Sequence, residues 1–299
     1  MNLQTLIEER QEVEDTYKDQ VLHINNDLLY VDKYGVVATE DFIFADTGLR
    51  QLCSWTNIPY AFFIKLSPDL KQQVLDEMVE KLENRKLMLR SEGQKVRGVL
   101  SDKYRIVNHT EVLTRVRDVV GSDREVTEVH FNAGLMSLRI TEPSTSLNAG
   151  ISIQNSELGE CSIGVAPFIY RLVCSNGLIV ATKEAIFKQV HSGTREYAMQ
   201  DAIYEAFGIA ETSRTLFELT KYKKLLPERI EEEINRVIKK IGLPNRIIPA
   251  VKSCYDEEPM PNGFGIINAL TRYAKGTDLK ERVAIETSAS RLISLYSGN

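Results

Sequence analysis

The sequence predicts an α+β protein in which a mostly antiparallel sheet with flanking helices is followed by a helical C-terminal region. Residues 124–190 are rich in apolar strand segments, and turn residues recur between them at short intervals, for example at Asn155-Ser156 and Asn176-Gly177. That spacing is typical of antiparallel strands. After about residue 196, the apolar residues instead recur with helical spacing. The chain has 299 residues, 43% of them hydrophobic, which is enough for a sizeable core.

Residues 1–44 are predicted to form an N-terminal helix and a hairpin. The first 20 residues have the pattern of a short amphipathic helix. This helix should end before Val21, because residues 21–24 and 28–35 have the composition of two short strands. Asn25-Asn26 lies between them, so we expect a hairpin near residues 21–38.

Residues 45–193 are predicted to form an α+β core. Its first half has a helix over residues 46–55, a helix that begins at Ser67-Pro68, and a helix that ends near Val120. Two strands between the second and third helices should pair as a hairpin. The predicted strands of this region are Lys86–Arg90, Lys95–Leu100, and residues 125–131, 135–141, 151–154, 161–165, 168–173 and 178–182.

Residues 194–299 are predicted to form a helical region. Its best-marked helix spans residues 227–241, with Pro227 in the first turn and Gly242 with Pro244 as stop signals. The acidic first turn of this helix suits the positive end of the helix dipole, so it requires no metal or catalytic role. The other predicted helices span residues 201–225, 246–254, 265–275 and 279–295.

The predicted hairpin near residue 90 has two unlike faces. Because side chains alternate along a strand, Leu87, Leu89, Val96 and Leu100 should face the core. Residues 85–105 include seven basic and two acidic residues, whereas the whole chain has a net charge of -5. Such a local excess favours a phosphate ligand, although a solvated face that is basic by chance fits the same pattern. The side chains expected on the basic face are Lys86, Met88, Arg90, Lys95 and Arg97.

The apolar segment Phe168–Val180 contains one arginine, Arg171. A buried arginine requires a carboxylate or a phosphate as its partner. Two interpretations therefore remain, an ion pair with Glu157 and a contact with a ligand. Asn176-Gly177 is predicted to form the tight turn of this segment. A second basic set surrounds it and consists of Arg171, Lys183, Lys188, His191 and Arg195.

Familiar catalytic and metal-binding motifs are absent from the sequence. There is no Gly-x-x-x-x-Gly-Lys-Ser/Thr loop and no Gly-x-Ser-x-Gly elbow, and Gly263-Phe-Gly265 lacks the third glycine of a dinucleotide-binding loop. The four histidines and the four cysteines lack the spacing that brings metal ligands together. We therefore expect no metal and no cofactor.

The location of the protein is predicted from its apolar segments. The first residues lack the basic and apolar regions of a signal peptide, and no apolar run approaches the ~18 residues of a membrane span. We therefore expect a cytoplasmic protein without a membrane partner.

Five segments, in this order, resemble a phage- and plasmid-encoded family catalogued as domain of unknown function number 932. The resemblance spans roughly residues 45–295, and Arg171-Leu-Val-Cys-Ser-Asn-Gly-Leu178 is its most specific part. In the last segment, Phe264 stands where the family pattern has tryptophan. The other four segments are Gln51-Leu-Cys with Ile58-Pro-Tyr60, Val96–Arg105, Asn155–Gly159 and Gly265–Tyr273.

The resemblance implies a mobile-element protein in the cytosol of a bacterial host, with no assigned chemistry. The order of hairpin, sheet and helix is also distantly similar to that of ring-forming single-strand annealing proteins. This second likeness concerns architecture and not motifs, and architecture does not determine function.

The leading hypothesis is a non-enzymatic, homo-oligomeric protein that binds single-stranded DNA as an annealing or recombination mediator. Its alternative is a protein-interaction module that acts on a host or defence factor. A third hypothesis is an enzyme whose dispersed site contains His130, Glu157, Arg171 and Asn176. The residues expected to bind DNA are Lys86, Arg90, Lys95, Arg97, Lys103, Tyr104 and Arg105, extended by Arg171, Lys183 and Lys188.

Overall fold

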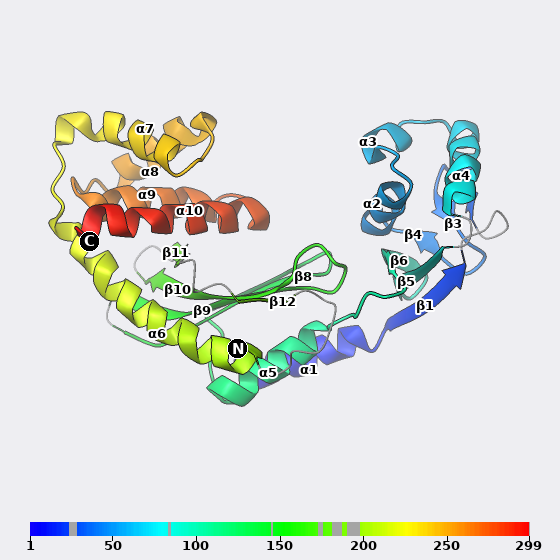
Figure 1. Ribbon diagram of the computed structural model, residues 1–299, viewed down its shortest axis with the longest axis horizontal. Helices are drawn as coiled ribbons and strands as arrows, with labels where there is room; N and C mark the ends of the chain where they lie inside the picture. Colours follow the sequence, from blue (N-terminus) through cyan, green and yellow to red (C-terminus); the bar gives the residue numbers. More distant parts are fainter. Residues whose placement is uncertain are drawn as a thin grey trace.

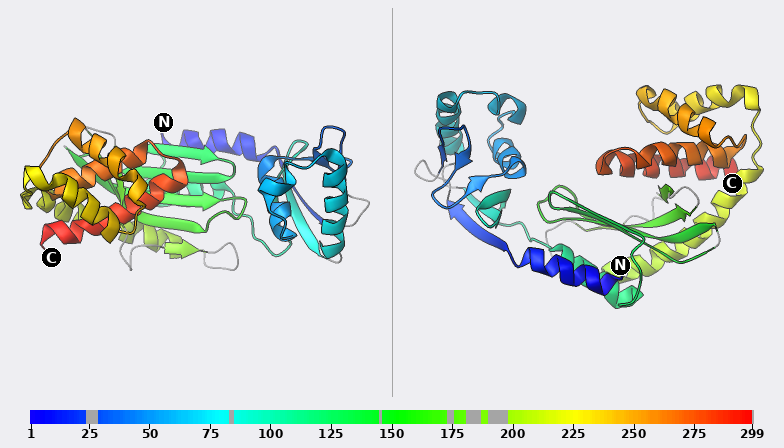
Figure 2. Two further views of the ribbon diagram at one scale, coloured as in Figure 1. Left: turned by 90° about the horizontal axis from the view of Figure 1, so that it is seen from above. Right: turned by 180° about the vertical axis from the view of Figure 1, so that it is seen from behind.

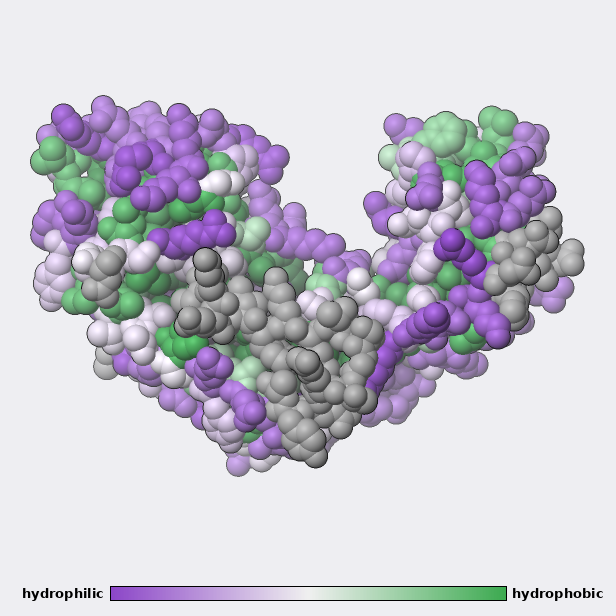
Figure 3. All heavy atoms as spheres, viewed as in Figure 1, coloured by the Kyte–Doolittle hydropathy of each residue, from purple (hydrophilic) through white to green (hydrophobic). Residues whose placement is uncertain are grey.

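Two β-sheets form the framework of the protein. The computed structural model describes residues 1–23, 29–82, 85–144, 146–172, 176–180, 187–189 and 198–298. The first sheet and its helices form the smaller arm of a U-shaped molecule, and the second sheet and the C-terminal helices form the larger arm (Figure 1). An open notch separates the upper parts of the two arms (Figure 3). The predicted α+β class is confirmed.

The first sheet has the strand order β1-β5-β6-β4-β3-β2. All of its strand pairs are antiparallel except β4 with β6. Helices α2, α3 and α4 pack their apolar residues against one face of this sheet. The elements are β1 (Tyr17–His23), β2 (Tyr30–Val31), β3 (Val37–Ala38), β4 (Ile43–Phe44), β5 (Lys86–Glu92), β6 (Lys95–Ser101), α2 (Asp46–Trp55), α3 (Tyr60–Phe63) and α4 (Pro68–Leu82).

The hairpin predicted near residues 21–38 is wrong. Strand β1 pairs with β5 along seven residues, from Tyr17 opposite Glu92 to His23 opposite Lys86. Strand β2 pairs instead with β3, and Asn25-Asn26 lies outside the described residues. A local turn signal indicates where the chain can reverse, but it does not select the partner strand. The longer strand β5 offers β1 many more backbone hydrogen bonds than the two-residue strand β2 does.

The hairpin β5–β6 is confirmed, with one change of register. A β-bulge opposite Arg90 and Ser91 shifts the alternation of β6. Consequently Leu87, Leu89 and Val96 face the core beneath α2–α4 as predicted, and Val99 is the next residue of this core. Leu100 is also buried, but outside this core. A single extra residue has this effect because the side chains of a strand alternate with a period of two.

The second sheet has the order β11-β10-β9-β8-β7, with β12 also paired to β10, and every pairing is antiparallel. The strands predicted at residues 161–165 and 168–173 are one continuous strand. The elements are β7 (Glu128–Asn132), β8 (Leu135–Thr141), β9 (Leu147–Ser156), β10 (Ile163–Arg171), β11 (Asn176–Ile179) and β12 (Phe187–Gln189).

Helices cover both faces of the second sheet (Figure 2). The side chains of Leu138, Ile140, Ile151 and Ile153 face α1 (Leu3–Glu14), α5 (His109–Val120) and α6 (Ala198–Leu219) and form an apolar core with them. The opposite face lies beneath the C-terminal helices. This opposite face carries polar side chains. One of them is Arg139, which lies between Leu138 and Ile140 in the sequence and donates a hydrogen bond to Glu286 on α10.

The predicted helical C-terminal region is confirmed. Short 3-10 turns follow α6 at Leu219, earlier than the predicted end at residue 225. The helices pack around one apolar core together with residues of β10 and β11. Their bounds are α7 (Ile230–Lys240), α8 (Ile248–Glu257), α9 (Gly263–Lys275) and α10 (Leu279–Ser297). The proposed boundaries at residues 44 and 193 stay a prediction.

Asn176-Gly177 does not form a turn, contrary to the prediction. Both residues lie in β11, where Asn176 pairs with Arg171 and Gly177 pairs with Tyr170. Gly177 is required by a close approach, since a Cβ atom at this position would lie 2.4 Å from the ring of Phe168. The glycine therefore reflects packing across two neighbouring strands, a feature that only the folded chain reveals.

None of the helices within the described ranges is both long and apolar enough to cross a membrane.

Candidate functional site

The predicted basic face of the hairpin is not an open surface. Arg90, its central residue, is only 1% exposed, so its expected exposure is wrong. Its Nη2 donates a hydrogen bond of 2.7 Å to Oδ1 of Asn108, the residue that precedes α5. The start of α5 thus covers the middle of the face. Lys86 and Lys95 remain exposed at opposite ends of the hairpin.

Tyr17 is surrounded by guanidinium groups. The guanidinium carbons of Arg90 and Arg97 lie 4.7 Å and 4.8 Å from the centre of its ring, and that of Arg10 lies at 5.8 Å. Arg10 also donates a hydrogen bond of 2.8 Å from Nη2 to the Tyr17 hydroxyl. Arg97 is partly buried and lies 3.4 Å from a carboxylate oxygen of Glu92. Cation–π contacts and this ion pair occupy the two arginines that the sequence placed on a solvent-facing surface.

Glu157 is fully buried and directly follows β9. Its Oε1 accepts a hydrogen bond of 3.0 Å from the backbone N–H of His109, and its Oε2 lies 3.4 Å from Nη2 of Arg10. Burial raises the pKa of Glu157 to about 7, although the His109 amide and the charges of Arg10 and Arg90 act in the opposite direction.

A second buried carboxylate, that of Glu14, lies beside Glu157. Its Oε1 accepts a hydrogen bond of 3.1 Å from the backbone N–H of Thr110, and its Oε2 contacts the Thr110 hydroxyl. Both carboxylates therefore bind backbone N–H groups in the first turn of α5, where the helix dipole favours negative charge. We call this group, which joins α1, β1, β5, α5 and β9, the junction cluster: Arg10, Glu14, Tyr17, Arg90, His109 and Glu157.

Tyr104 belongs to the same contact region between the arms. Its hydroxyl donates a hydrogen bond of 3.2 Å to the carbonyl of Ser156, and its ring lies against Gly159. Burial, the largest effect, raises the pKa of its hydroxyl above the ordinary value. The ring is partly buried and not fully available to a base. Its neighbours Lys103 and Arg105 are exposed, and Arg105 lies 3.8 Å from Glu111.

Gln51 links the two arms through its side-chain amide. Its Nε2 donates a hydrogen bond of 2.6 Å to the carbonyl of Leu158, and its Oε1 accepts a hydrogen bond of 2.7 Å from the backbone N–H of Val99. A Cβ atom at Gly98 would lie 2.8 Å from the end of the Leu158 side chain, so a larger residue there would require this side chain to move. Three of the segments that carry the family resemblance, around residues 51, 96–105 and 155–159, therefore meet at the contact between the arms.

Arg171 is paired with Glu258 and not with Glu157. Its Nη1 and Nη2 donate hydrogen bonds of 2.8 Å and 2.5 Å to the two carboxylate oxygens of Glu258. Asn268 on α9 donates a hydrogen bond of 3.2 Å to the same carboxylate. The expected pairing with Glu157 is wrong, and the bidentate pair instead fixes β10 to the C-terminal helices. Lys183 lies outside the described residues, as does the side chain of Lys188, whose backbone is part of β12.

Three residues of the dispersed catalytic site, His130, Glu157 and Arg171, each have a different partner. His130 lies 2.9 Å from a carboxylate oxygen of Glu128. Glu157 belongs to the junction cluster, and Arg171 forms an ion pair with Glu258. Asn176 pairs with Arg171 in the sheet. Within the described ranges, no group of three or more His, Cys, Asp or Glu residues could hold a metal ion.

A buried ionic network connects the second sheet to α10. Arg139 on β8 donates from Nη1 to Glu128 at 2.8 Å and from Nη2 to Glu286 at 2.5 Å. Arg282 on α10 binds the same two carboxylates, at 2.8 Å and 2.9 Å. Burial acts to raise the pKa of Glu128, but the two arginines outweigh it and lower this pKa to about 2. No local sequence signal indicates this network, because its two halves, Glu128 with Arg139 and Arg282 with Glu286, are more than 140 residues apart.

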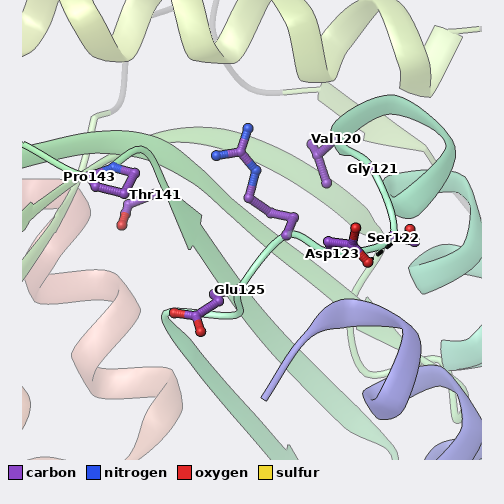
Figure 4. A pocket seen from close by; sticks show the side chains of 8 residues that line it. Val120, Gly121, Ser122, Asp123, Glu125, Thr141 and Pro143 are labelled. Atoms are coloured by element: carbon purple, nitrogen blue, oxygen red, sulfur yellow. Dashed lines mark hydrogen bonds between the residues drawn. The ribbon is translucent and has the colours of Figure 1, made fainter.

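Two hollows lie on the second sheet. One has a volume of about 560 Å³ and lies where the loop after α5 meets the end of β8, with Ser122, Asp123 and Glu125 beside Thr141 and Pro143 (Figure 4). Its charged residues include Arg124, which lies 3.6 Å from Glu142. The other hollow, of about 320 Å³, lies between β9, β10 and α10. Neither hollow has a histidine among its described lining residues.

The comparisons with known proteins identify a family for part of the chain. Residues 96–240 match the family described as Domain of unknown function (DUF932). This match confirms the predicted likeness over these residues and supports an uncharacterised domain family. No curated protein and no solved structure matches the chain.

Proposed function

We propose that the protein binds single-stranded nucleic acid through exposed cations around the hairpin β5–β6. The observation that carries this proposal is a set of four cations, each exposed and none in an ion pair with a described residue. Two of them, Lys86 and Lys95, begin the two strands and lie at opposite ends of the hairpin, about 20 Å apart at the usual rise per residue. We call Arg85, Lys86, Lys95 and Lys103 the rim cations.

Their placement suits a flexible polyanion better than a compact ligand. Lys103 follows the end of β6, and Ser101 pairs with Leu87, so Lys86 and Lys103 lie at the same end of the hairpin. A chain of phosphates that runs along the hairpin contacts both ends, whereas a small anion contacts only one. Arg90 and Tyr104 are left out of the proposed site, because the junction cluster and Ser156 already hold them.

We further infer that this activity serves annealing or recombination in a phage or plasmid protein, in the cytoplasm of a bacterial host, and that the protein acts as a homo-oligomer. The support is the family resemblance together with the order of hairpin, antiparallel sheet and long helix α6. Light scattering is expected to give a mass of several chains, at least when DNA is bound. A mass of one chain both with and without DNA contradicts this part of the proposal.

The Lys86→Gln/Lys95→Gln/Lys103→Gln variant is expected to bind a 30-residue oligo(dT) at least roughly tenfold more weakly than the wild type at low salt. The slope of log Kobs against log salt should decrease by about 2, since each lost phosphate contact changes it by about 0.7 for a single strand. Fluorescence anisotropy at several salt concentrations measures both quantities.

A matched control carries the same change of charge elsewhere. Lys224→Gln/Lys239→Gln/Lys240→Gln alters three exposed lysines of the helical region and should bind like the wild type. Equal weakening in both triple variants, or wild-type binding that does not depend on salt, contradicts the proposed site.

A second candidate function is a protein-interaction module, and the observation that favours it is the outer edge of β1. No strand in the described part of the chain pairs with this edge, and Lys18, Gln20 and Val21 are exposed along it. An open edge strand accepts an extended segment of another protein. In that case, a partner captured from host lysate should remain bound after nuclease treatment, and the change Val21→Lys should release it. Loss of all captured protein on nuclease treatment contradicts this candidate.

A further inference from the structure

The hollow of about 320 Å³ between the second sheet and α10, which we call the α10 cavity, has the size of a small ligand pocket. Helix α10 lies along this face of the sheet (Figures 1 and 2). The cavity exists because the sheet presents small residues there: Ser152 on β9 pairs with Ala166 on β10, and Gly164 lies two residues before Ala166. Val283 and Thr287, one turn apart on α10, form the opposite wall.

The α10 cavity contains a buried hydrogen-bonding group without a partner. Ser152 is only 2% exposed, and its hydroxyl makes no hydrogen bond with any described residue. On the neighbouring strand β8, the hydroxyl of Ser137 is in the same state and faces the same side, because Ser137 is two residues from Arg139, which pairs with Ser152. Buried polar groups are normally paired, so the Ser152 hydroxyl, which lines the cavity, indicates a bound polar molecule.

The walls of the α10 cavity are uncharged. Besides Ser152 they offer the amide of Gln154 and the hydroxyls of Ser162 and Thr287. Burial raises the pKa of the Cys161 thiol to about 11, so this lining group is neutral near pH 7. The neighbouring ionic network adds no net charge, since it joins two arginines to two glutamates. An anionic or cationic ligand would therefore find no opposite charge among the lining residues.

We propose that the α10 cavity binds a nucleoside as an uncharged ligand. The Gln154 amide offers a donor and an acceptor in one plane, which complements the hydrogen-bonding edge of a base. The hydroxyls of Ser152, Ser162 and Thr287 complement the sugar, and Ile179 supplies an apolar contact. This site lies on the second sheet and is separate from the rim cations, so each proposal can fail without the other.

The test is titration of the full chain with adenosine, cytidine and uridine, followed by ligand-observed NMR and calorimetry. At least one nucleoside is expected to bind with a Kd of 1 mM or below, and ribose alone should bind at least tenfold more weakly. Ala166→Leu should fill the cavity and reduce nucleoside binding more than tenfold, whereas oligo(dT) binding should not change. The control Ala284→Leu, on the exposed side of the same helix, should bind like the wild type.

Two milder variants keep the test valid if Ala166→Leu does not fold. Thr287→Val removes one hydroxyl with little change in shape, and Gln154→Leu removes the amide; each should weaken nucleoside binding about tenfold. The proposal is overturned if none of the three nucleosides binds, if ribose binds equally well, or if neither milder variant weakens binding. In these cases the α10 cavity holds water only, or a molecule of another class.

Discussion

Glu286→Leu is expected to lower the free energy of unfolding by about 3–5 kcal/mol, the usual cost of breaking a buried ion pair on one side. Glu286 is fully buried and accepts hydrogen bonds from two arginines, Arg139 at 2.5 Å and Arg282 at 2.9 Å. Leucine is of similar size but leaves both guanidinium groups with fewer partners in a buried environment. Urea unfolding at pH 7 measures the change.

A double variant and a surface control distinguish this cause from a packing defect. In Arg139→Met/Glu286→Leu, one positive and one negative charge are removed together, so the loss should be smaller than the sum of the two single losses. Asp256→Ala breaks the exposed pair of Lys252 and Asp256 and should cost at most about 1 kcal/mol. A loss below about 1 kcal/mol for Glu286→Leu would show that the buried network contributes little.

Glu157→Gln is expected to change how stability depends on pH. The pKa of Glu157 in the folded protein, about 7, lies above the ordinary value of 4.5. The folded state therefore binds a proton more tightly than the unfolded state does. The stabilisation that Glu157 gives the folded state is fully present below pH 4.5 and is lost as the pH rises through 7. The loss lowers the free energy of unfolding by about 3 kcal/mol in all. Glutamine keeps the shape of the protonated acid and does not titrate.

The measurement is the free energy of unfolding of the wild type and of Glu157→Gln at several pH values from 5 to 8. The free energy of unfolding of the variant relative to that of the wild type should rise from pH 5 to about pH 7 and then level off. Arg10→Gln provides a matched test, because removing a nearby positive charge should raise the pKa of Glu157 further. The loss of stability with rising pH should then occur at higher pH than in the wild type. If the free energies of unfolding of the wild type and of Glu157→Gln differ by the same amount at every pH, the raised pKa of Glu157 is contradicted.

Local sequence signals predicted most helices and strands. The α7 helix follows its apolar stripe and its terminal proline and glycine, and the second sheet follows short apolar segments separated by turns. These signals act over a few residues, so they survive in the folded chain. The core face of β5 was also predicted, since Leu87 and Leu89 face the apolar core.

The sequence-based predictions were wrong where a strand or a side chain pairs with a residue that is distant in the sequence. Strand β1 pairs with β5 across about 70 residues, and Arg171 binds Glu258 across 87 residues. Gly177 resembled a turn residue, whereas its small size is needed beside Phe168. A sequence pattern records the preference of each segment but not which segment packs against it.

The sequence by itself determined the α+β class, the core residues Leu87 and Leu89 of β5 and the excess of positive charge between residues 85 and 105. Only the tertiary structure decided which of these charges meet solvent. Arg90 is covered by the start of α5, which comes after it in the chain, whereas Lys86 and Lys95 are exposed at the two ends of the same hairpin. Charge is a property of the residue, but exposure depends on every element that packs around it, and so the proposed binding surface could be placed only in the folded protein.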